Sequence, residues 1–255
     1  MSRWKAAAIH LSISLTLAAI VATLLYTMWF PPPYFRAAGA SDLIPLLMGV
    51  DIIMGPLLTL VVISPGKPKK LRQLDLSIIV ALQVVAFGYG FYVVCQARPV
   101  FIVAESDRLV IVAADELTNA DLAKGNRPEY RSRSWRGPQL VGALPPTGPQ
   151  VAEFTMKVLA GGKDIDQLPE YYVPYEQLAD RLMKHALPLD LLKPADADQR
   201  KQLAALESDA TTRGQTLQFL PLQRGPEDYA AIIAPGQRQP VAVLHVDPWV
   251  TPTKK

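Results

Sequence analysis

The sequence predicts a membrane protein in which three N-terminal transmembrane helices precede a periplasmic α+β domain with an antiparallel sheet. Two observations lead to this fold class. Three long apolar stretches lie within the first 97 residues, whereas residues 98–255 alternate polar, charged and proline-rich stretches with short apolar runs. A spanning helix needs about 20 mostly apolar residues to cross a hydrocarbon core about 30 Å thick. We therefore divide the chain into a membrane domain, residues 1–97, and a soluble domain, residues 98–255.

The three apolar stretches cover about residues 6–30, 43–63 and 74–97. The first stretch has two features of a cleaved signal peptide, since Arg3 and Lys5 precede it and an Ala-Gly-Ala sequence occupies residues 38–40. Its apolar run is, however, longer than the 7 to 15 residues of a signal-peptide core, and the small residues lie far beyond its end, after three prolines. We expect an uncleaved helix.

Basic residues in the short loops predict the orientation. They are concentrated at the amino end and between the second and third helices, at Arg3, Lys5, Lys67, Lys69, Lys70 and Arg72. The first loop contains only Arg36, and the third helix ends at Arg98. Because loops rich in Lys and Arg stay in the cytoplasm, the amino end is expected inside and everything after Arg98 outside. In a bacterium this arrangement is a multi-pass inner-membrane protein with a periplasmic C-terminal domain.

The charge distribution does not indicate nucleic-acid binding. The formal net charge is +3, but the basic excess lies in the first 97 residues and follows from topology. One arginine-rich stretch, residues 127–136, also contains Tyr130 and Trp135. A nucleic-acid site would need a clustered basic face with aromatic platforms. We interpret this stretch as a solvated loop that faces lipid headgroups or a partner, and expect no nucleic-acid partner.

Short elements follow one another in the soluble domain. Residues 100–104 and 109–113 are apolar runs separated by four polar residues, which predicts a hairpin. Three strand-like runs separated by Gly- and Pro-containing turns close the chain and predict an antiparallel meander. Periodicity and breakers further predict helices at 115–124, 151–159, 174–187 and 197–210, a strand at 139–144, and closing strands at 216–222, 229–234 and 241–246.

No catalytic or metal-binding pattern stands out. His10, His185 and His245 lie in separate predicted elements, and none has a close ligand partner at helical spacing. His245 and Asp247 share one predicted strand face, but a pair of this kind arises by chance. Gly161 and Gly162 are not followed by the lysine–serine pair of a phosphate-binding loop. We expect no enzyme activity, no metal and no cofactor, and a function in recognition.

Asp51 is the exceptional residue of the second apolar stretch. A charge at mid-bilayer depth costs ~2.5 to 3.5 kcal/mol on insertion scales, so such a side chain usually faces protein or water. Gly49 and Gly55 lie nearby and permit close helix approach. One interpretation is intramolecular, with Asp51 bonded to a polar residue of its own helices: His10, Ser12, Ser14 or Tyr89. The other interpretation is a contact with a partner.

Several segments of the first 120 residues resemble the TfpX/TfpZ family of type IV pilin accessory proteins. The resemblance rests on an ordered combination of PPPYF (residues 31–35), GVDIIMGPLLT (residues 49–59) and QARPVF (residues 96–101). It implies an inner-membrane protein that serves a cognate type IV major pilin, supporting pilin stability, pilus assembly or retraction, and twitching motility. Other pilus assembly proteins are further candidate partners, and the resemblance implies no catalysis.

A type IV pilin resides in the membrane as a long apolar helix with a charged amino end. An accessory protein that holds this helix needs a lateral face, and we hypothesise that Asp51, Gly49 and Gly55 form it. Tyr34, Phe35 and Arg36 follow the three prolines as a short periplasmic segment. Aromatic residues in this position usually anchor the headgroup region, and contact with the pilin is the alternative.

A second class of function stays open from the sequence. A membrane-anchored periplasmic sensor could bind a ligand and transmit a signal through the helices. Such a sensor needs an output module, yet the expected cytoplasmic parts are only the amino end and one short loop. A sensor would therefore have to act through a partner.

Overall fold

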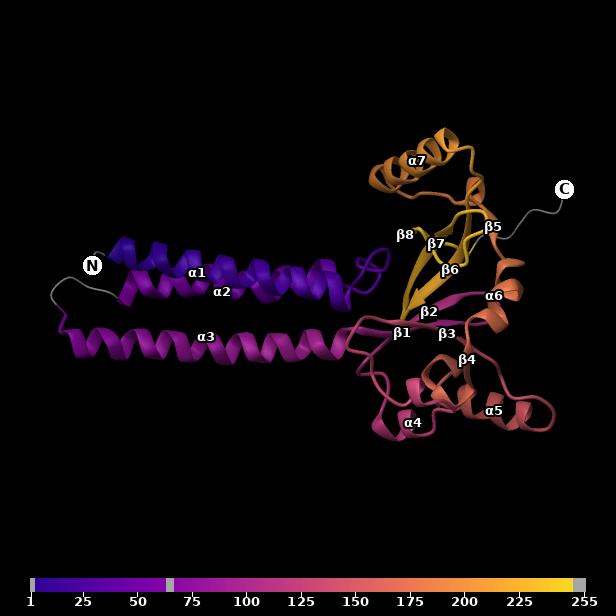
Figure 1. Cartoon of the computed structure of the whole chain (residues 1–255), viewed down its shortest axis with the longest axis horizontal. Coiled ribbons are helices and arrows are strands. Elements are labelled where there is room, and N and C mark those ends of the chain that lie inside the picture. The colour runs from indigo at the N-terminus through magenta and orange to yellow at the C-terminus, as the bar shows by residue number, and fades with distance from the viewer. Residues whose placement is uncertain (1–2, 63–66, 250–255) are drawn as a thin grey trace. The chain divides into compact units, whose positions relative to one another are not determined.

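The computed structural model describes residues 3–62 and 67–249, and it divides into two compact units (Figure 1). The apolar helices form one unit. The second unit contains the sheet domain from Arg98 onward together with the segment Trp29–Ala38, which lies between two of the helices in the sequence. Each unit is described by itself.

The first unit contains three helices at the positions that hydropathy predicts. They are α1 (Arg3–Leu24), which continues as a π-helical turn (Leu25–Trp29), α2 (Ala40–Val62) and α3 (Lys69–Ala97). By length and composition each is able to cross a membrane. The predicted last residue of the second span, Ile63, lies outside the described residues. These helices fit a membrane anchor, and α2 packs against both α1 and α3.

The second unit is built around one sheet. Within the described residues its eight strands are β1 (Pro99–Ala104), β2 (Leu109–Ala113), β3 (Gln139–Ala143), β4 (Tyr172–Pro174), β5 (Leu187–Pro188), β6 (Gln218–Arg224), β7 (Glu227–Ile233) and β8 (Ala242–Leu244). The order is β4-β3-β1-β2-β6-β7-β8, and β5 pairs with β6 outside this path.

The sheet is mixed, so the prediction of an antiparallel sheet was wrong for the sheet as a whole. The hairpin β1–β2 and the meander β6–β7–β8 are antiparallel, as predicted. However, β3 pairs parallel to β1, and β6 pairs parallel to β2. Parallel neighbours need a long crossover connection. Tight-turn signals show hairpins, but they carry no information about which strands meet after a long crossover.

Helices and loops cover both faces of this sheet. The domain helices are α4 (Asn119–Ala123), α5 (Gln150–Leu159), α6 (Glu176–Met183) and α7 (Ala197–Thr212). Along β1, Ile102 and Ala104 join a core cluster that includes residues of α6, whereas Phe101 and Val103 join a cluster that includes Leu122 of α4. A third cluster places α7 residues against β6, β7 and β8. A sheet buried on both faces has strands that are apolar throughout, as β1 and β2 are.

Candidate functional site

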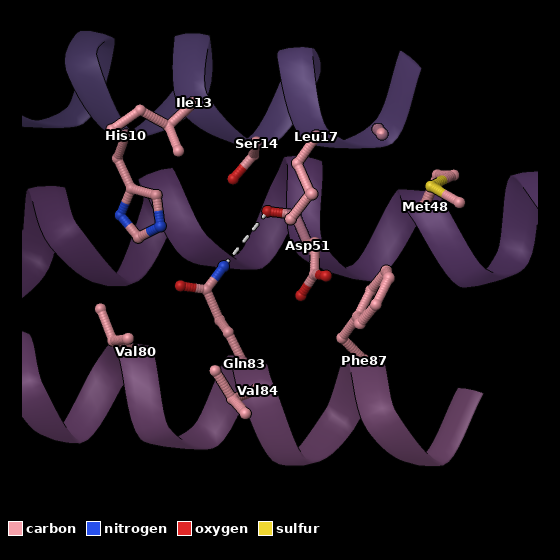
Figure 2. Close-up of a pocket in the computed structure, with 11 residues that line it drawn as sticks. His10, Ile13, Ser14, Leu17, Met48, Asp51, Val80, Gln83, Val84 and Phe87 are labelled. Carbon is pink, nitrogen blue, oxygen red and sulfur yellow. Dashed lines mark hydrogen bonds between the residues drawn. The ribbon is translucent and has the colours of Figure 1, made fainter. Parts of the chain in front are cut away.

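The candidate site is a groove in the helical unit, lined by all three apolar helices (Figure 2). Its cavity has a volume of about 240 Å³. The lining residues are His10, Ile13, Ser14, Leu17 and Ala18 of α1, Met48 and Asp51 of α2, and Val80, Gln83, Val84 and Phe87 of α3.

Two of its walls are regular helical stripes. The lining positions of α1 and of α3 each recur every three or four residues, the spacing of one helix face. Apolar residues in these stripes are exposed in the isolated chain: Ile13 is 63% exposed and Val84 is 65% exposed. The groove is therefore a largely apolar channel bordered by exposed aliphatic side chains of two helix faces.

Asp51 lies in this channel between the two stripes. Gln83 Nε2 lies 3.5 Å from the Asp51 backbone oxygen, the contact that Figure 2 marks with a dashed line. Within the described residues, Asp51 Oδ1 is inaccessible to solvent and has no hydrogen-bond partner. Buried polar atoms are nearly always hydrogen-bonded, and exceptions mark functional sites or missing partners. Asp51 Oδ1 is thus a buried acceptor that the described residues leave unsatisfied.

None of the four intramolecular partners predicted for Asp51 is hydrogen-bonded to its side chain within the described residues. His10 Nδ1 lies 2.7 Å from Thr59 Oγ1, and Ser12 Oγ donates to the Ala8 carbonyl at 2.9 Å. Ser14 lines the groove, while Tyr89 is 72% exposed. Within residues 3–62 and 67–249, no hydrogen bond joins any of the four to the Asp51 side chain. The polar neighbour is Gln83, which sequence reasoning missed although it, too, is a polar side chain inside an apolar run.

The two glycines near Asp51 have different environments. Gly55 is buried, and a Cβ atom there would overlap Gln83 Nε2 and lie 2.9 Å from His10 Nε2. Gly49 has open space around it, since no atom of the described residues beyond its chain neighbours and the adjacent backbone of its own helix lies within 4 Å of where its Cβ atom would be. Gly55 therefore brings the three helices together beside Asp51, while Gly49 lines neither cavity that contains Asp51.

Asp51 also borders a second cavity, between α2 and α3. This cavity has a volume of about 460 Å³. Its lining includes Leu46 and Val50 on α2, and Tyr89 and Val93 on α3. Unlike the first groove, it has no wall from α1, so only the first groove is flanked by helices on both sides of α2.

The segment after the three prolines belongs to the sheet domain. Tyr34 is buried in a core cluster with Ile102, Tyr175 and Leu220, and burial raises the pKa of its phenol. Arg36 is exposed and Phe35 is half-buried. These three candidates thus belong to the second unit and Asp51 to the first. Tyr34 is a packing residue, whereas Arg36 is accessible and Phe35 is partly so.

The remaining polar clusters do not form a metal site within the described residues. No group of three or more His, Cys, Asp or Glu side chains there has an arrangement suited to a metal ion. His245 instead stacks with Tyr229, with ring centroids 4.9 Å apart.

The fold and the groove together fit a membrane-anchored protein with a mixed-sheet domain. A carboxylate lies between its apolar helices, and one oxygen of this carboxylate has no hydrogen-bond partner among the described residues. Comparison with known proteins gives the family. The chain is 32% identical over 220 residues to "Fimbrial assembly protein, serogroup I" of Dichelobacter nodosus, covering 86% of this chain and 85% of the relative. It is 30% identical over 219 residues to the serogroup E1 protein of the same organism, again covering 86% and 85%. This chain belongs to the fimbrial assembly protein family.

Two further comparisons agree with this assignment. The protein of serogroups C1 and C2 is 39% identical over 113 residues, covering 44% of this chain and 86% of that protein. The family described as "Fimbrial assembly protein FimB" matches residues 1–39, which contain α1 and the segment that joins the sheet domain. No solved structure matches the chain. The relatives bear the fimbrial assembly name, so the comparisons support that broader class rather than the narrower TfpX/TfpZ name.

Proposed function

We propose that this protein is an inner-membrane accessory protein for a cognate type IV major pilin, acting without catalysis in fimbrial assembly. The names of its relatives support a role in assembly, and three apolar helices support the membrane location. The positive-inside pattern supports a cytoplasmic amino end and a periplasmic sheet domain. In this proposal the protein stabilises the pilin before assembly, and loss of pili and of twitching motility is the cellular consequence.

The observation that carries the proposal is the buried Asp51 oxygen in an apolar channel. An isolated buried carboxylate is costly, and the cost falls when a charged or hydrogen-bonding partner reaches it. A pilin helix brings an apolar surface for Ile13 and Val84 and a charged amino end that can approach Asp51. Helix association in lipid depends on close packing and interhelical hydrogen bonds, and this channel offers both.

We propose the remaining candidates in different roles. Gly55 sets the helix spacing beside Asp51, and Gly49 offers a second close-approach surface on another face of α2. Phe35 and Arg36 are candidates for contact with the pilin where it leaves the bilayer. Tyr34 supports this contact indirectly, because its burial fixes the segment on the sheet domain.

The test is pilin co-purification with the full chain from the native membrane. Asp51→Leu removes every polar atom of the side chain, and we expect recovered pilin to fall at least about tenfold, the effect of losing roughly 1.4 kcal/mol of binding free energy. Asp51→Asn keeps a hydrogen-bonding group but no charge, so its loss should be smaller. Asp42→Leu and Asp42→Asn, at the exposed start of the same helix, serve as matched controls.

A second pair of variants tests the channel itself. Val84→Trp fills the groove from its α3 wall, whereas Val85→Trp adds the same bulk at the next position, which does not line the groove. We expect only Val84→Trp to reduce pilin recovery. Normal recovery and normal piliation in Asp51→Leu and Val84→Trp, with the proteins present at wild-type levels, would remove this groove from the mechanism.

A further inference from the structure

A second surface combines arginine and tryptophan side chains in the sheet domain. The Arg98 guanidinium lies over two indole rings, 5.2 Å from the centroid of Trp29 and 4.5 Å from that of Trp135. The two indole rings lie 5.7 Å apart, and Trp29 Nε1 donates to the Trp135 carbonyl at 3.2 Å. Cation–π contacts of this kind fix the arginine and both rings in one arrangement.

The covalent chain places this cluster beside the ends of two apolar helices. Trp29 is the last residue of the first candidate span, and Arg98 directly follows Ala97, the last residue of the third. Where these helices leave the hydrocarbon, Trp29 and Arg98 lie at the membrane–water interface, the zone that tryptophan prefers. Trp135 contacts both residues, although it is far from them in sequence, and it is 59% exposed.

A basic cavity lies next to these rings. It has a volume of about 330 Å³ and is lined by Arg98, Asn119, Leu122, Arg131, Ser132, Arg133 and Trp135. Arg133 is committed to the fold, since it donates to the backbone oxygens of Ala114 and Leu117 and to Asn119 Oδ1. Arg131 uses only Nε, which donates to the Gly125 carbonyl at 2.8 Å, so its terminal nitrogens have no partner among the described residues. Arg136, which follows Arg131 closely in the sequence, is exposed.

We propose that this cavity binds the phosphate of an anionic phospholipid headgroup, with Arg131 of its lining as the ligand-binding side chain. Arg136 does not line the cavity, and its exposed charge adds to the positive potential of the same short segment. Arginine presents a planar fork of donors that matches phosphate oxygens. The cavity contains three arginines and no carboxylate in its lining, which makes it complementary to an anion. A lipid is favoured over a soluble anion because Arg98 of the cavity lining, and Trp29, which contacts Trp135 of that lining, directly adjoin two apolar spans in the sequence. The proposal rests on the membrane insertion stated under Proposed function, but not on pilin binding.

The test uses the fluorescence of the cluster in the full chain reconstituted into vesicles. A Trp4→Phe/Trp249→Phe background leaves Trp29 and Trp135 as the emitting residues, because the chain has 4 tryptophans. Phosphatidylcholine vesicles contain a minor fraction of either dibrominated phosphatidylglycerol or dibrominated phosphatidylcholine. We expect stronger quenching by the anionic lipid, and Arg131→Gln/Arg136→Gln to reduce that preference about fivefold or more. This readout is local, so the basic loop between α2 and α3 does not contribute.

Control variants and a competition arm separate the explanations. Arg131→Lys/Arg136→Lys keeps the charge and should retain part of the preference, which shows that the loss in the glutamine variant comes from charge. Arg200→Gln/Lys201→Gln removes two exposed positive charges on α7 and should leave the preference unchanged.

Equal quenching by both lipids in the Trp4→Phe/Trp249→Phe background, or no effect of Arg131→Gln/Arg136→Gln, would overturn the proposal. Loss of the preference in millimolar inorganic phosphate would assign the site to free phosphate and overturn the lipid assignment. Pilin co-purification, measured in parallel, reports separately on the Asp51 groove.

Discussion

Three carboxyl groups in the sheet domain illustrate how burial controls the chemistry of single residues. Burial raises the pKa of Glu105 to about 7 despite the Arg108 guanidinium 2.9 Å away, and like charges at Asp166, Asp164 and Asp107 add to the effect. Burial also raises the pKa of Asp166 to about 6, with Asp164 contributing. Glu116 follows the same pattern, with a pKa of about 7 caused by burial and then by Asp166. Protonation of these groups therefore favours the folded state.

The consequence is a domain that gains stability on mild acidification. The folded pKa values exceed the ordinary values of 4.5 for Glu and 3.8 for Asp, so the stabilisation is complete below those values and is lost as pH rises through about 6 to 7. Lowering the pH from about 7.5 to 5.5 should raise the free energy of unfolding by about 2 to 4 kcal/mol, because each Glu contributes about 2 kcal/mol at most and the three groups are coupled. Thermal unfolding of the purified full chain, followed at both pH values, measures this as an increase in melting temperature.

The variant Asp166→Asn tests whether these carboxyl groups cause the pH dependence of the melting temperature. It removes the negative charge next to Glu105 and Glu116, so the melting temperature at pH 7.5 should rise and its pH dependence should flatten. Glu207→Gln, on the exposed side of α7, should preserve the wild-type dependence. A melting temperature that falls steadily from pH 7.5 to 5.5 in the wild type would contradict the assignment.

At the scale of elements, the same substitution at two glycines of α2 should reduce stability at one position and leave it unchanged at the other. In Gly55→Leu the new side chain meets the ends of the Gln83 and His10 side chains, so these must move out of their present positions between the helices. Overpacking of this kind costs about 1 to 3 kcal/mol. Gly49→Leu adds the same atoms where no neighbour lies within 4 Å, and it replaces glycine by a better helix former. We expect a lower melting temperature and reduced pilin recovery for Gly55→Leu, and wild-type stability for Gly49→Leu. Equal stability of the two variants would show that Gly55 is not a packing contact.

The elements show how far sequence reasoning extends. Apolar length predicts α1, α2 and α3, and alternating apolar runs with tight turns predict β1–β2 and β6–β7–β8, because these signals are local. The parallel pairs β1–β3 and β2–β6 depend on long crossovers that have no local signature. The same limit applies to the candidate site. The cost of a carboxylate in an apolar span identifies Asp51 from the sequence, but the stripes of α1 and α3 that line the groove depend on how the helices pack, which has no local sequence signal.

At the scale of the whole molecule, the segment Trp29–Ala38 connects the two units in an unexpected way. In the sequence it is a loop between two apolar helices, and a headgroup anchor is the simplest expectation. In the structure it groups with the sheet domain, where Tyr34 and Ala37 complete a core cluster and Trp29 contacts Arg98 and Trp135. The sheet domain is therefore attached to the helices at three chain positions, before and after this segment and at Arg98.

Within the segment Trp29–Ala38, buried Tyr34 should contribute to folding, and exposed Arg36 is the candidate for recognition. Tyr34→Ala empties a buried site in the sheet domain and should destabilise it by about 3 kcal/mol or more, as large-to-small changes of buried aromatic residues do. Limited proteolysis of the full chain in detergent should then cleave the sheet domain faster than in the wild type. Arg36→Ala, two residues away but exposed, should leave the proteolysis rate unchanged. If Arg36→Ala nevertheless reduces pilin recovery, the segment contacts the pilin directly. If only Tyr34→Ala reduces pilin recovery, the segment acts through the packing of the sheet domain. A wild-type proteolysis rate for Tyr34→Ala would show that this core contact is dispensable.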